Sequence, residues 1–276
     1  MKTFSEYKSS LDHTYIRESA APQYTLFPKD KEKLKLMIEK EIKKQGNAAD
    51  LNHIDVSNVK DLSRLFYKSN FCGDISRWNV SNVEDMHEMF MHAESFFGDI
   101  SDWDVSNVKN MKKMFYNATE FNQDLSGWDV SNVTDMSEMF SFTCFNGDIS
   151  TWDVRNVKDM SDMFQNSDFN GNIKRWNTKN VENMAGMFCH AESFNQDISK
   201  WDVSKVTNME YMFSSAESFN QDISGWDVSN VKDMSYMFES SPFNKDISNW
   251  DVSNVSRAVA PFFDSACPEE HQPKFK

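Results

Sequence analysis

Aspartate is the residue whose spacing most suggests chemistry in this chain of 276 residues, because it recurs at two positions of a repeated motif. Seven aspartates follow an apolar residue by one position, with Asn79 and Asn177 replacing aspartate in two further units: Asp55, Asp104, Asp129, Asp153, Asp202, Asp227 and Asp251. A second column contains Asp74, Asp99, Asp124, Asp148, Asp197, Asp222 and Asp246. Stacked carboxylates could hold calcium, which takes six to eight oxygen ligands. Aspartate beside a turn, however, commonly accepts a hydrogen bond from a nearby backbone N–H group.

The glycine content favours the turn role for these aspartates. Calcium-binding β-rolls use glycine-rich nonapeptide repeats, whereas this chain has eight glycines in all. We therefore expect the aspartates to be structural and assign no metal site. A column of asparagine just after each aspartate is likewise expected to satisfy buried backbone groups at successive bends: Asn58, Asn82, Asn107, Asn132, Asn156, Asn180, Asn230 and Asn254.

Histidine, cysteine and methionine do not combine into a catalytic set. His92 and His190 are equivalent residues of distant repeats, and at the usual strand spacing they would lie about 19 Å apart, too far to share one metal ion. The repeated methionines stand beside phenylalanine at helical spacing, which favours a core role over copper binding. The four cysteines form no CxxC pair, which favours free thiols: Cys72, Cys144, Cys189 and Cys267. We predict a protein that is not an enzyme and has no cofactor.

Basic residues that replace the usual repeat residues are the best candidates for binding a ligand. Six of them fall in the same part of adjacent repeats: Arg155, Lys174, Arg175, Lys179, Lys200 and Lys205. The chain as a whole is acidic, with a formal net charge of −14. One interpretation is sequence drift, partly neutralised by the neighbouring aspartates. The other is a surface patch that contacts an anionic ligand.

These side chains are positioned by a tandem repeat whose clearest marker is tryptophan. The unit reads DISxWDVSNVxxMxxMF, and its tryptophans recur every 24 or 25 residues: Trp78, Trp103, Trp128, Trp152, Trp176, Trp201, Trp226 and Trp250. A period in the twenties is typical of a solenoid, in which each repeat is one turn stacked on the next. We interpret the tryptophans as a ladder of core residues.

Hydrophobic spacing within one repeat predicts a short strand and a short helical segment. Ile100, Trp103 and Val105 have the LxxLxL spacing, with the period of two that is typical of a half-buried strand. The next apolar residues are spaced as one face of a helix: Val108, Met111, Met114 and Phe115. The predicted fold class is therefore α/β, a leucine-rich-repeat-like solenoid with one strand and one helical segment per turn and an N-terminal capping helix.

The pattern divides the chain into four parts. A capping helix is expected from Asp30 to about Lys44, with Gly46 as its end. Pro261 interrupts the last repeat, because proline is poorly accommodated inside a helix. The predicted parts are an irregular segment (1–27), the capping helix (28–50), a solenoid of about nine turns (51–257) and a C-terminal cap and tail (258–276). Within the solenoid, 54–151 and 152–249 realign as a duplicated four-turn block.

The unit WDVSNVxxMxxMFxxAxxFNxDIS closely resembles the repeat of BspA-like leucine-rich repeat surface proteins, the group that includes mycoplasma-type lipoprotein repeats. The resemblance covers residues 51–257, and the stretch from Phe27 to Asn52 is similar to the segment that often precedes such arrays. It implies a solenoid and, in many members, surface display, adhesion or host contact. It brings no catalytic residues.

We expect a non-enzymatic recognition scaffold that binds a protein or a glycan through its repeat surface. The alternatives are an intracellular acidic inhibitor or immunity-type protein that masks a basic effector, and a structural spacer or assembly subunit. The negative charge argues against nucleic acid as a partner, and no apolar run reaches the length needed for membrane insertion. The absence of a signal peptide favours the cytoplasm, whereas the resemblance favours the cell surface for a chain trimmed of its export signal. The sequence specifies neither the ligand nor the oligomeric state.

Overall fold

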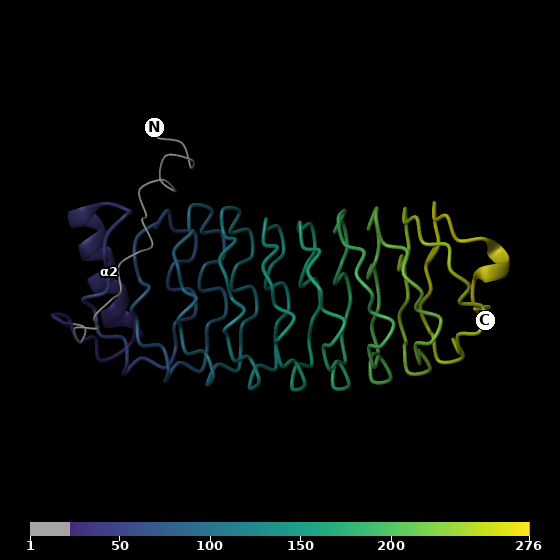
Figure 1. Cartoon of the computed structure of the whole chain (residues 1–276), viewed down its shortest axis with the longest axis horizontal. Coiled ribbons are helices and arrows are strands. Elements are labelled where there is room, and N and C mark those ends of the chain that lie inside the picture. The colour runs from purple at the N-terminus through teal and green to yellow at the C-terminus, as the bar shows by residue number, and fades with distance from the viewer. Residues whose placement is uncertain (1–22, 276) are drawn as a thin grey trace.

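The computed structural model describes residues 23–275 as a single row of stacked coils (Figure 1). Each coil is one repeat, and successive coils lie side by side along the long axis. Most of the segment predicted to be irregular, residues 1–22, lies outside the described residues. Helix α2 stands at one end of the row and the carboxyl-terminal residues at the other.

Helix α2 (Lys31–Gln45) begins and ends at the residues that the sequence indicates. The Asp30 side chain accepts a hydrogen bond from the Lys33 N–H group, which caps the first turn. Gly46 ends the helix with a φ of 86°, and its N–H group donates to the Ile42 carbonyl. One face is apolar, with Leu34 and Ile38 buried in the same core as the coils. The other helical element between residues 23 and 275 is the 3₁₀-helix η1 (Glu269–His271).

The predicted α/β solenoid with a strand and a helical segment in every turn is wrong. In the part of the chain that the structure describes, α2 and η1 are the regular elements, and the coils pair through isolated parallel bridges. One bridge column runs the length of the row through Asp61, Asp85, Asn110, Asp135, Asp159, Asn183, Asn208, Asp233 and Arg257. Each coil is therefore a chain of turns that contacts the next coil at fixed points.

The expected helical segment fails because two residues in each coil have positive φ. In one coil these are Lys113 at 55° and Asn117 at 53°, and a left-handed residue breaks a right-handed helix. Some backbone N–H groups of this segment instead donate to a carbonyl of the next coil, and others donate to a carbonyl of their own coil. Met111 donates to Asp135 of the next coil, whereas Met114 donates to Met111 in its own coil. Both methionines are still fully buried, so the apolar spacing that reads as a helix face also fits this series of turns.

The expected strand fails because its backbone bonds are local. The Trp103 N–H group donates to the Ile100 carbonyl at 3.2 Å, and the Val108 N–H group donates to the Val105 carbonyl at 2.9 Å. Such bonds close turns within one coil. The contact with the preceding coil is made by the Trp103 side chain, whose Nε1 donates to the Ile75 carbonyl at 3.2 Å.

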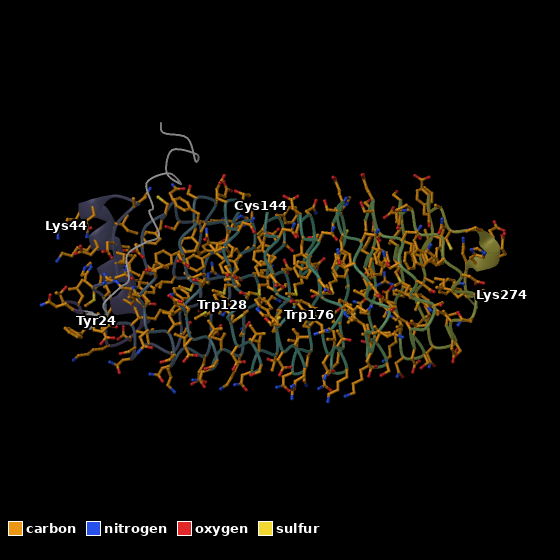
Figure 2. The ribbon with its side chains drawn as sticks, viewed as in Figure 1. Tyr24, Lys44, Trp128, Cys144, Trp176 and Lys274 are labelled. Carbon is orange, nitrogen blue, oxygen red and sulfur yellow. The ribbon has the colours of Figure 1, made fainter. Side chains whose placement is uncertain are left out.

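The core consists of side-chain ladders along the row. All eight tryptophans are buried, and Trp128 and Trp176 mark their path in Figure 2. Rings stack between coils, with centroids 5.6 Å apart for Phe90 and Phe115 and 6.4 Å apart for Trp78 and Trp103. Seven indoles bond the preceding coil as Trp103 does: Trp78, Trp103, Trp128, Trp152, Trp176, Trp201 and Trp226. Each of these tryptophans thus contributes both a buried aromatic ring and a hydrogen bond to the preceding coil.

Polar ladders hold the bends where the sequence places aspartate and asparagine. The Asp104 carboxylate accepts a bond from the Ser106 N–H group at 3.1 Å, and Asp99 does the same for Ser101. The Asn107 Nδ2 donates to the Ser81 carbonyl of the preceding coil at 2.7 Å. The bridge column follows the same rule, as in Asp135, so the prediction that these residues serve backbone groups is confirmed.

Candidate binding surfaces

The six basic residues Arg155, Lys174, Arg175, Lys179, Lys200 and Lys205, here called the basic corner, lie on three consecutive coils. These coils contain Trp152, Trp176 and Trp201, and all six basic side chains are exposed. Each is adjacent in sequence to a buried residue, so the core fixes the backbone from which the basic side chain projects.

Half of the basic corner is held by neighbouring polar groups. Arg155 lies 2.8 Å from Asp153, and the Lys205 Nζ donates to the Asn180 side chain at 2.7 Å. Lys174 lies 2.6 Å from Asp197, and its hydrogen bond holds the pKa of that carboxyl well below the ordinary value. This half fits neutralisation by neighbouring acids.

The other half of the basic corner has no such partner. Among the described residues, no carboxylate lies within 4.0 Å of the side-chain nitrogens of Arg175, Lys179 or Lys200. Exposed cations of this kind are free to meet an anionic group of a ligand.

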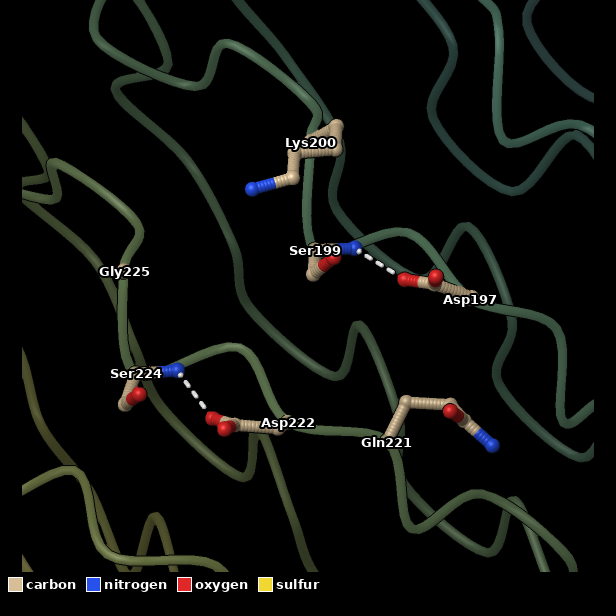
Figure 3. A pocket seen from close by; sticks show the side chains of 7 residues that line it. All are labelled: Asp197, Ser199, Lys200, Gln221, Asp222, Ser224 and Gly225. Carbon is tan, nitrogen blue, oxygen red and sulfur yellow. Dashed lines mark hydrogen bonds between the residues drawn. The ribbon is translucent and has the colours of Figure 1, made fainter.

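Lys200 borders an open groove of about 360 Å³ between two coils (Figure 3). Its lining is polar and consists of Asp197, Ser199, Lys200, Gln221, Asp222, Ser224 and Gly225. Figure 3 shows Asp197 and Asp222 bonded to the N–H groups of Ser199 and Ser224, so one oxygen of each carboxylate is engaged in its own turn. The Lys200 ammonium and the Gln221 side-chain oxygen remain to bond polar groups of a ligand, because the Gln221 amide nitrogen donates to Asn195 and the two serine hydroxyls bond Asp197 and Asp222.

A second hollow, of about 350 Å³, lies at Gly186 and was missed from the sequence. It is lined by Asp162, Gln165, Ala185, Gly186, Cys189, His190, Glu210, Tyr211, Ser214 and Glu239. The signal was a lost side chain: the repeat reads Ala185-Gly186 where the equivalent coils have a large residue such as Glu138 or Tyr211. Such a loss adds no charge or polar group to the sequence, so it stands out less than the six basic replacements do.

The Gly186 hollow combines a raised carboxyl pKa with an unreactive thiol. Burial, and then the nearby carboxylates of Glu138 and Asp159, raise the pKa of Asp162 to about 6. Burial and Asp162 raise the pKa of Cys189 to about 11, so this thiol is protonated at neutral pH. A protonated thiol is a poor nucleophile. Cys189 and His190 are neighbours here, but the hollow offers binding groups and no thiolate.

Two further features bear on what the surface can hold. Among residues 23–275, no group of three or more His, Cys, Asp and Glu side chains is arranged to hold a metal ion. None of the helices in the described part of the chain has the length and apolar character needed to cross a membrane.

One family model matches most of the chain, in overlapping segments at residues 33–144, 123–207 and 166–273. The repeated matches agree with the tandem coils seen in the structure. No curated protein and no solved structure matches significantly. The chain belongs to the family described as Mycoplasma protein of unknown function, DUF285.

Proposed function

We propose that this protein is a non-enzymatic recognition scaffold that binds a protein or glycan through the basic corner. The observation that carries the proposal is the set of three unpaired cations, Arg175, Lys179 and Lys200, on adjacent coils of an acidic chain. Most equivalent coils carry uncharged or acidic residues at these positions, as at Ser131, Gly225 and Asp102, although Arg77 stands before Trp78 as Arg175 stands before Trp176. Since the core does not need these cations, their chemistry is available for a ligand.

The consensus side chains support a binding role over a catalytic one. The consensus aspartates, and the consensus asparagines from Asn82 to Asn254, are engaged with backbone groups of their own turn or of the preceding coil. The tryptophans, methionines and phenylalanines are buried. Function therefore depends on residues that depart from the consensus, and the basic corner gathers six such departures on adjacent coils.

We further propose that the protein acts at a cell surface, in adhesion or host contact, as a relative of the BspA-like leucine-rich repeat proteins. A mycoplasma repeat family is compatible with this setting. Treating intact cells that express the native gene with an external protease tests it. Loss of the protein from intact cells supports surface display, whereas protection until lysis contradicts it.

The binding proposal is tested with defined probes and matched variants. The parent chain, Arg175→Glu/Lys200→Glu and the control Lys35→Glu/Lys232→Glu would be measured against sulfated, sialylated and neutral glycans and against acidic peptides. The control changes the net charge equally at exposed lysines without ion pairs elsewhere. We expect association with the anionic probes to slow in the corner variant alone, and to slow with salt in the parent, because the Debye length is about 8 Å at physiological ionic strength.

Equal behaviour of the two double variants would contradict the basic corner as a binding site. The acidic net charge favours one alternative, a protein that masks a basic effector. In that case a basic protein probe would bind the parent chain, and both double variants would bind it at least as well. A structural spacer would bind none of the probes and would form an ordered oligomer on sizing.

A further inference from the structure

Gly186 interrupts a column of residues that otherwise carry side chains, although the backbone conformation at this position does not require glycine. In the coils before the degenerate last one, the equivalent residues all have positive φ between 52° and 59°: Arg64, Glu88, Lys113, Glu138, Asp162, Gly186, Tyr211 and Tyr236. Seven other residues adopt this conformation with a side chain in place. What distinguishes Gly186 is therefore the missing side chain and the hollow that results.

Elsewhere in this column a cation is held by a carboxylate and an aromatic ring. Arg64 pairs with Glu88 of the next coil at 3.5 Å and lies 4.4 Å from the centre of the Tyr67 ring. Lys113 pairs with Glu138 at 3.1 Å and lies 5.6 Å from the centre of the Tyr116 ring. The column thus contains two cations, each supplied by the chain itself.

The Gly186 hollow has a carboxylate, from Asp162 of the preceding coil, and a ring, from Tyr211 of the next coil, and its lining contains no lysine or arginine. The Asp162 carboxylate occupies the place where a Cβ of residue 186 would stand, which only glycine allows. On the other side lies Tyr211, which is stacked on Tyr236 with ring centroids 4.8 Å apart and an interplanar angle of 8°. Glu210 and Glu239 complete a negative lining.

We propose that the Gly186 hollow binds a lysine or arginine side chain of a partner polypeptide, paired with Asp162 and placed against the Tyr211 ring. A cation there forms an ion pair and a cation–π contact, the two kinds of contact that Arg64 and Lys113 make in the same column. The partners differ in place, because Arg64 and Lys113 use a ring three residues on in their own coil, where this coil has Cys189. The aliphatic stem of lysine or arginine packs along an aromatic ring, which favours a side chain over a free amine. The site is separate from the basic corner and does not depend on it.

The backbone amide of Gly186 can report binding in an NMR titration. The Gly186 N–H group donates to the Glu210 carbonyl at 2.7 Å, so its amide signal senses the lining of the hollow. The ¹⁵N-labelled full chain would be titrated by NMR with N-acetylated hexalysine amide, with hexaglutamate as the charge control and spermidine as a free amine. We expect hexalysine to shift the Gly186 signal, and hexaglutamate to leave it unchanged. A shift with spermidine alone would overturn the assignment to a polypeptide.

Two variants and one control decide which residue holds the cation. Asp162→Asn should weaken hexalysine binding about fivefold, which corresponds to about 1 kcal/mol, a value typical of one accessible ion pair. Gly186→Lys should abolish binding, because its side chain takes the space that the Asp162 carboxylate occupies and brings a cation into the hollow. Glu217→Gln removes one exposed charge elsewhere and should bind as the parent does. Equal binding by the parent and Asp162→Asn would overturn the proposal even if Gly186→Lys failed to fold.

Discussion

The tryptophan ladder makes a prediction that separates its hydrogen bonds from its packing. Trp152 and Trp250 are similarly buried, at 3% and 6% exposed, and each stacks on the tryptophan of the preceding coil. Trp152 donates its Nε1 to the Leu125 carbonyl at 3.0 Å, whereas the Trp250 Nε1 is buried without a partner. Replacing either residue with phenylalanine removes a similar buried volume. The hydrogen bond is lost at Trp152 only.

The expected difference follows from the loss of one inter-coil hydrogen bond. Both substitutions lose packing, but Trp152→Phe also removes the indole donor from the Leu125 carbonyl, which keeps its bond from the Trp128 N–H group. A hydrogen bond of this kind contributes about 0.5–1.5 kcal/mol. Trp250→Phe removes an indole N–H group that had no partner, so this term is absent or favourable. Trp152→Phe should therefore lower the free energy of unfolding by about 0.5–1.5 kcal/mol more than Trp250→Phe does.

Urea denaturation measures this difference. The midpoint should fall further for Trp152→Phe than for Trp250→Phe while the slope stays the same, which shows that the change lies in stability and not in the surface exposed on unfolding. Trp226→Phe controls for position along the row. Trp226 lies in the coil next to that of Trp250, and this variant loses a hydrogen bond to the Ile198 carbonyl. Equal losses for all three variants would refute the inter-coil hydrogen bond as a source of stability.

Three further predictions concern the Gly186 hollow and the repeat as a unit. Because the fold raises the pKa of Asp162 to about 6 from its ordinary 3.8, ionisation opposes folding, and stability should fall as pH rises from about 4 to 6. Asp162→Asn should remove that fall in pH-dependent thermal melts, so a parent-like pH profile would contradict it. Cys189, with its pKa raised to about 11, should react with iodoacetamide far more slowly at pH 7.5 than a free thiol in a peptide, as followed by mass spectrometry. Deleting residues 152–249 joins Thr151 to Trp250 in frame and should leave a shorter cooperative fold, whereas an aggregated product on sizing and circular dichroism would count against the duplicated block.

The sequence predicted what each repeated side chain does better than the path of the backbone between them. Buried tryptophan, turn-forming aspartate and inter-coil asparagine follow from residue type and period, because each has one favourable use in a stacked repeat. The strand and helix failed for a different reason. The first positive-φ residue of most coils is arginine, glutamate, lysine or tyrosine, which have no special preference for that conformation. The second includes residue types that favour positive φ, such as Asn117, Asn166 and His190, so the local signal against a helix is present in some coils and absent in others.

The candidate sites show the same division. The six basic residues were found because they add a charge that the motif lacks, and the structure leaves all of them exposed. The Gly186 hollow escaped notice because it arises from an absent side chain, whose meaning depends on Asp162 and Tyr211 in the coils on either side. Residues 24 or 25 positions apart become neighbours only once the stacking register is known.

The departures from the repeat are concentrated on a few consecutive coils, and their charges are opposite. The basic corner occupies the coils of Trp152, Trp176 and Trp201, and Gly186 and its Asp162 neighbour belong to the first two of these. One surface presents unpaired cations, and the other presents carboxylates beside a tyrosine ring. A ligand that occupies both must carry groups of both signs. Polypeptides do so routinely, whereas acidic glycans supply only the anionic part, so occupation of the Gly186 hollow by a basic peptide would favour a protein as the ligand of this scaffold.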